Sequence, residues 1–111
     1  MSFKISNVIQ DEANREWVRS VFETVNSAKT LDPSIAVTKV ALSGSSYTIV
    51  LPNGTVGEHK IVTVVSNTGG NVTIQYNGGW GGSTTIGLGS VGDTVEFIAT
   101  VGGWHNRNWI D

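Results

Sequence analysis

Histidines and carboxylates are the side chains of this sequence that could carry acid–base or metal chemistry, and they are few. There are two histidines and no cysteine. A metal site could combine one of them, His59 or His105, with a carboxylate. Asp93 and Glu58 are the candidates, but no spacing brings three ligands together. Asp93 and Glu96 lie three residues apart, hence on opposite faces of a strand, which makes them poor partners for glycoside hydrolysis. We therefore predict no catalytic residue, no metal and no cofactor.

Two of these residues have simpler roles open to them. Asp93 follows Gly92, and we expect its side chain to shape a turn. His105 follows a tight turn, and we interpret it as a structural or surface residue. A ring of histidines at an oligomer axis is the alternative.

Residues 87–92 read GLGSVG and match the G-x-G-x-x-G spacing of dinucleotide-binding loops. Such a loop must leave a strand and open a helix, so that backbone amides and the helix dipole meet the pyrophosphate. Here the strand-like sequence DTVEFIAT follows instead. We therefore interpret this match as a turn between strands.

The glycine-rich sequence QYNGGWGGSTT is the more serious candidate for ligand binding. Trp80 could stack on the face of a sugar, with Tyr76 and Asn77 beside it. Trp104 and Trp109 could complete such a platform. The alternative is that these tryptophans pack against a neighbouring subunit or close one end of the fold.

An N-terminal helix is the first element that the sequence predicts. Residues 11–28 place apolar side chains on one helical face, and Asp32-Pro33 would stop the helix. We expect residues 1–34 to form an N-terminal arm and this helix, and residues 2–9 could be either a short strand or an extended arm. The expected anchor or oligomer interface consists of Trp17, Val21, Phe22, Trp104 and Trp109.

From residue 35 onward the apolar period falls to about two, which is typical of β-strands. In this reading Tyr47, Ile49 and Leu51 point to one face of a strand, and Thr48 and Val50 point to the other. The apolar run KIVTVVS suits a central core strand. Dipeptides such as Asn53-Gly54 and Gly102-Gly103 accept tight-turn geometry at little cost. The sequence therefore predicts a mainly β protein with one N-terminal α-helix, in which residues 35–111 form an antiparallel β-sandwich or barrel of about six or seven short strands.

The chain carries little charge. Charged residues make up 14% of it, against about 25% in typical domains. Lys and Arg number 7 and Asp and Glu number 9, and no basic cluster is present, which argues against nucleic acid as a partner. No apolar run is long enough to span a bilayer. A surface so poor in charge suggests that neighbouring subunits cover part of it.

Residues 37–109 resemble small virion proteins of tailed bacteriophages. The resemblance rests on the sequences YTIVLPNGTVGEHKIVTVVSNTGGNVTI and STTIGLGSVGDTVEFIATVGGWHNRNW. Similar turn-and-strand elements recur in head-fibre, capsid-decoration and tail-fibre domains, which are β-sandwich or barrel modules that assemble as trimers. The resemblance carries no catalytic residue.

The resemblance implies a viral structural protein that is not an enzyme. We expect a trimeric capsid decoration, or cement, protein that binds the major capsid protein and stabilises the phage head. It would be located on the capsid surface of the virion after assembly in the host cytoplasm. The alternative is a tail-fibre or head-fibre module that binds a host glycan through Tyr76, Asn77 and Trp80. A small enzyme is the least favoured reading.

Overall fold

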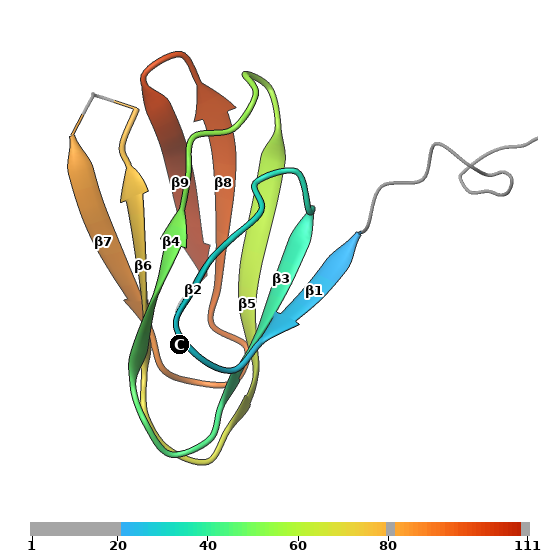
Figure 1. Cartoon of the computed structure of the whole chain (residues 1–111), viewed down its shortest axis with the longest axis vertical. Coiled ribbons are helices and arrows are strands. Elements are labelled where there is room, and N and C mark those ends of the chain that lie inside the picture. The colour runs from blue at the N-terminus through green and yellow to red at the C-terminus, as the bar shows by residue number, and fades with distance from the viewer. Residues whose placement is uncertain (1–20, 80–81, 110–111) are drawn as a thin grey trace, which may run out of the picture.

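The protein is a two-layered sandwich of nine described strands (Figure 1). A computed structural model describes residues 21–79 and 82–109, with the backbone alone at Trp109. One sheet has five strands in the order β1-β3-β5-β8-β9, and the other has four in the order β2-β4-β6-β7. The strands are β1 Phe22–Val25, β2 Lys29–Thr30, β3 Val37–Leu42, β4 Tyr47–Leu51, β5 His59–Asn67, β6 Val72–Asn77, β7 Ser83–Leu88, β8 Thr94–Thr100 and β9 Gly103–Trp109.

The first six strands wind alternately between the two sheets. Each strand from β1 to β5 is followed by a strand of the opposite sheet, so β1, β3 and β5 run parallel, as do β2, β4 and β6. Only the pairs β5–β8, β8–β9 and β6–β7 are antiparallel. The predicted β-sandwich is therefore present, but its sheets are mixed, and the prediction of antiparallel sheets was wrong.

The turn dipeptides explain this difference. Asn53-Gly54 accepts the geometry of a tight hairpin turn, but it lies, like Gly69-Gly70, in a connection that crosses from one sheet to the other. Gly69 and Gly70 have φ values of 148° and 98°, which glycine adopts without the penalty of a side chain. Such a glycine permits a sharp reversal of the chain. It does not specify whether the next strand pairs with the preceding strand or joins the opposite sheet.

The predicted helix does not continue into the described part of the chain. Residues 22–25 form β1, which pairs in parallel with β3 from Phe22 opposite Val37 to Val25 opposite Val40. The helix predicted for residues 11–28 is therefore wrong from residue 21 onward, and residues 11–20 lie outside the described residues. Because β1 and β2 belong to the two sheets, the sandwich includes residues that precede position 35.

The alternation of apolar residues correctly predicts which side chains face the core. Ile49 and Leu51 of β4, and Val72 and Ile74 of β6, are buried between the sheets. In the central strand β5 only alternate residues are buried, and Val65 is exposed on the outer face. Val65 is the extra residue of a bulge, because Val40 pairs with Val64 whereas the next residue of β3 pairs with Ser66.

One end of the sandwich is closed around Trp104. Its side chain is completely buried and donates a hydrogen bond from Nε1 to the carbonyl of Pro52 at 3.0 Å. Phe97 packs edge-to-face between Trp104 and Tyr76, with ring centroids 6.0 and 4.8 Å apart. Trp104 therefore closes one end of the fold, which was one of its two predicted roles, and it is not exposed for contact with a neighbour.

Two glycine pairs that are distant in the sequence make this closure possible. Gly79 donates its N–H to the carbonyl of Trp104 at 2.9 Å. A Cβ on Gly102 would lie 2.6 Å from the carbonyl oxygen of Gly79, and one on Gly103 would lie 2.6 Å from that of Gly78. Both distances are too short for a carbon atom. The start of β9 therefore lies directly against the end of β6, and the two sheets are joined there.

Replacing Trp104 by Ala should strongly destabilise the fold. The variant loses the buried aromatic contacts and leaves a cavity, so we expect the free energy of unfolding to fall by about 3–5 kcal/mol. Urea unfolding followed by far-UV circular dichroism measures this loss. Val101→Ala, in the adjacent turn and 94% exposed, should change it by about 0.5 kcal/mol or less. Equal effects of the two substitutions would contradict this account of the closed end.

Candidate functional site

A buried ammonium group lies between β1, β3 and β5. Lys60 of β5 is completely buried, and its Nζ donates to Glu23 Oε2 at 2.9 Å and to the carbonyls of Ile35 and Asp32 at 2.8 and 3.2 Å. Thr38 donates its hydroxyl to the same carboxylate oxygen at 2.7 Å. These contacts hold the first strand and the connection before β3 against the centre of the five-stranded sheet.

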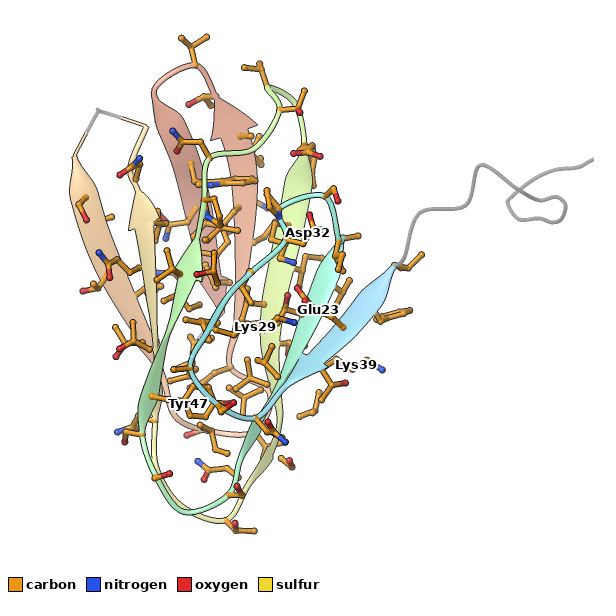
Figure 2. All side chains as sticks on the ribbon, in the orientation of Figure 1. Glu23, Lys29, Asp32, Lys39 and Tyr47 are labelled. Carbon is orange, nitrogen blue, oxygen red and sulfur yellow. The ribbon has the colours of Figure 1, made fainter. Side chains whose placement is uncertain are left out.

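The carboxylate of Glu23 balances the buried charge of Lys60. Its second oxygen, Oε1, lies 3.3 Å from Nζ of Lys29, which is half exposed (Figure 2). Burial alone would raise the pKa of Glu23. The hydrogen bonds from Thr38 and Lys60, with the positive charge of Lys60, outweigh burial and lower that pKa below its ordinary value. Glu23 therefore stays ionised and paired at neutral pH.

The GLGSVG segment ends β7 with Gly87 and Leu88, and its remaining residues lie in the connection to β8, as predicted for a turn between strands. Asp93 is buried, and its Oδ2 accepts hydrogen bonds from the N–H groups of Gly89 and Ser90 at 3.0 and 2.9 Å. The strand β8 follows directly. The expectation that Asp93 shapes this turn is confirmed. The segment has no helix after it and therefore lacks the geometry of a dinucleotide site.

The predicted sugar-binding platform is not assembled by its described members. Tyr76 is buried in the core and donates its hydroxyl to Asn106 Oδ1 at 3.0 Å, so it cannot stack on a ligand. Asn77 is exposed and contacts Asn53 through its side-chain amide at 3.3 Å. Trp80 and the side chain of Trp109 lie outside the described residues. The placement of Tyr76 in the platform was therefore wrong.

The predicted anchor residues do not lie together either. Trp17 lies outside the described residues, and Trp104 is in the core. Val21 and Phe22 are both exposed, Phe22 by 57%. The ring of Phe22 is covered on one face by Lys39, whose Nζ lies 4.5 Å from the ring centroid. Of the described anchor candidates, Val21 and Phe22 remain available to a partner, although they lie on or beside a strand and not on a helix.

The two histidines lie on the outer face of the five-stranded sheet. Ile98 of β8 pairs with His59 of β5 on one side and with His105 of β9 on the other. His59 Nδ1 lies 3.4 Å from Glu96 Oε2. The strand β8 therefore separates the two histidines. No group of three metal-binding side chains occurs within residues 21–79 and 82–109.

The outer face of the four-stranded sheet is polar and free of charge. The strand pairing places one row of outward residues on each of its strands. All are exposed or half-buried, and none carries a charge. This neutral face consists of Thr30, Thr48, Val50, Thr73, Gln75, Asn77, Ser83, Thr85 and Gly87. The opposite face of the molecule carries Lys39, Glu96 and Arg107, so the two faces differ in character.

The described surface is otherwise smooth. No pocket opens within the part of the chain that the structure describes. No helix that could span a membrane is found among the same residues. What the described residues offer is therefore a set of sheet faces and sheet edges. Phe22 is the only aromatic side chain among the exposed large apolar residues of the described part of the chain, which are Val21, Phe22, Val50, Val56, Val65, Val91, Ile98 and Val101.

Comparison of the chain with protein-family models, with curated proteins and with solved structures finds no significant match.

Replacing Glu23 by Gln should destabilise the fold, because the Lys60 ammonium would lose its buried anionic partner. We expect a loss of about 3 kcal/mol at neutral pH. The pKa of Glu23 is lower in the folded protein than in the unfolded chain. The pair therefore stabilises the fold above the ordinary carboxyl pKa, and this contribution disappears as the pH falls through the folded value. Urea unfolding of wild type and variant at successive pH values measures both effects.

Glu96→Gln is the matched control, since Glu96 is partly exposed beside His59. Its loss should be about 1 kcal/mol or less. The difference between wild type and Glu23→Gln should shrink in acid. A difference that persists unchanged to the acid limit would show that charge pairing is not the cause.

Proposed function

We propose that this protein is a non-enzymatic structural protein of a tailed-phage virion. In this proposal three copies assemble into a ring that binds the outer surface of the capsid and reinforces the head. The resemblance of residues 37–109 to small virion proteins supports the proposal, as do the low charge content and the β-sandwich architecture. The partner of the trimer is the major capsid protein.

The exposed apolar residues at β1 are the observation that carries this proposal. Phe22 is the first residue of β1, the edge strand of the five-stranded sheet, and Val21 directly precedes it (Figure 1). Both side chains are exposed. Covering a large apolar side chain contributes about 1.5–3 kcal/mol. An edge strand with exposed apolar side chains is the kind of surface that oligomers cover. A neighbouring subunit or the capsid surface would cover these residues.

The face of Phe22 next to Lys39 gives this contact some specificity. Lys39 lies opposite Thr24 in the neighbouring strand β3, so its ammonium covers one side of the ring, while more than half of the Phe22 side chain stays exposed. A partner that contacts the exposed part of the side chain keeps the cation–π contact, which strengthens when it is removed from water. A carboxylate on the partner could also pair with the Lys39 ammonium.

Replacing Phe22 by Ser should weaken assembly without unfolding the subunit. The ring is more than half exposed, so we expect little change in unfolding but at least a tenfold weaker association, as for a buried aromatic contact. Light scattering after size-exclusion chromatography measures the mass over a concentration series. The wild type should approach three times 11.8 kDa, about 35 kDa. Val101→Ser removes another exposed apolar side chain and should leave the mass unchanged.

The virion assignment has its own measurement. Quantitative mass spectrometry of purified particles should find on the order of hundreds of copies per virion if the protein covers the capsid lattice. A handful of copies would place it in the tail instead. Absence from the particles would overturn the proposal, whatever the oligomeric state in solution.

A further inference from the structure

Within residues 21–79 and 82–109, strand β7 is a sheet edge without the usual protection against pairing. It has six residues, Ser83–Leu88, with the sequence STTIGL, and it carries no charge and no proline. Soluble proteins normally blunt their edge strands with lysine, proline, bulges, short length or a covering element. In Figure 1, β7 forms one outer side of the molecule, away from β9.

The other three edges are better protected. The edge strand β2 has only two residues, and β1 has four. The first residues of β9 are covered by the closure, because Gly79 donates its N–H to the Trp104 carbonyl. The rest of β9 carries the exposed side chains of His105 and Arg107. Of the four edges, β7 is therefore the one that offers a continuous neutral backbone to a partner.

The hydrogen-bond pattern shows which groups on β7 face outward. In an antiparallel pair, residues that exchange hydrogen bonds alternate with residues that do not. Gly78 donates to the carbonyl of Gly82 at 2.6 Å, in register with the β6–β7 pairs. The N–H and C=O groups of Ser83, Thr85 and Gly87 therefore point away from β6. They form a row of three donors and three acceptors along the edge.

The inner face of β7 is also incompletely covered. At the closed end, β9 lies against β6 and not against β7, so β7 extends past the edge of the opposite sheet. Thr84 and Ile86 point inward but are only half-buried, whereas the β6 residues that pair with them, Tyr76 and Ile74, are buried. A strand added beside β7 would pair the free backbone groups and extend the four-stranded sheet.

We propose that β7 is the edge by which one copy of this protein adds to the sheet of a second copy. The occupant is a second copy because the neutral face continues onto β7. Identical subunits bring identical charges together, and a surface without charge avoids that repulsion. Ser83, Thr85 and Gly87 are small and uncharged, so two copies can approach closely. The inference does not depend on the virion assignment.

Thr85→Pro tests the proposal. Proline removes the outward N–H of Thr85 without removing a hydrogen bond to β6, and prolines of this kind are tolerated on edge strands. We expect the association measured by light scattering to weaken at least tenfold, with an unchanged circular dichroism spectrum. Thr85→Lys, which adds a charge at the same place, is the second variant should the proline variant not fold, and it should have the same effect.

Thr48→Lys is the matched control. Thr48 lies on the same neutral face, but on β4, which β6 separates from the edge strand β7. If copies add at the edge, Thr48→Lys should keep the wild-type association within about twofold, since exposed charges act weakly at a distance. If copies instead pack face against face, Thr48→Lys should disrupt assembly and Thr85→Pro should not, and the proposal would be overturned.

The mass of the wild type identifies the partner strand. A dimeric mass that does not change in the Phe22→Ser variant indicates that β7 of one copy pairs with β7 of the other about a two-fold axis. A trimeric mass that falls both in Thr85→Pro and in Phe22→Ser indicates a ring in which β7 of one copy meets the β1 side of the next. Both results support the inference. A wild type that stays monomeric overturns it, whereas the copy number in virions tests the proposed function separately.

Discussion

The burial of the Lys60 ammonium is the constraint on which the arrangement of the first strands depends. An ammonium without water requires an anion and further acceptors, and the structure supplies them from Glu23 on β1 and from the carbonyls of Asp32 and Ile35. Glu23 reaches Nζ from β1, which pairs with β3 so that Glu23 lies opposite Thr38. A slip of one residue would turn Glu23 to the outer face. The ion pair therefore specifies the pairing of a strand that has only four residues.

Which residues face the core could be predicted from the sequence, but which strands pair could not. The alternation of Val72, Ile74 and Tyr76 follows from the pleat of a strand and holds wherever that strand is placed. Pairing depends on contacts between residues far apart in the chain, such as Val37 with Ile61. A glycine turn leads equally well to a hairpin or to a crossing between sheets. The mixed sheets follow from that choice.

Residues 21–28 were wrongly predicted as helix because two patterns coincide there. Val21, Phe22 and Val25 fit one face of a helix, yet β-branched and aromatic residues also favour strands. The alternation of Glu23 and Val25, both directed inward in the structure, fits a strand equally well. Pairing with β3 and the contact with Lys60 decide the matter. Neither is visible in a local window, and a lysine within an apolar strand was the one feature that could have raised the question.

The candidate site was predicted only in part, because its contacts join residues that are far apart in the sequence. The sequence indicated that Trp104 could close one end. Its buried position, however, depends on a hydrogen bond to Pro52 and on glycine pairs from two turns that are distant in the sequence. That closure has a consequence for the rest of the surface. Because β9 of the five-stranded sheet meets β6, that sheet does not reach as far as β7. The strand β7 therefore extends past the edge of the opposite sheet. The glycines that close the fold at Trp104 thus leave an edge open beside it, and a fold that is well packed as a single subunit still presents backbone groups to a second copy.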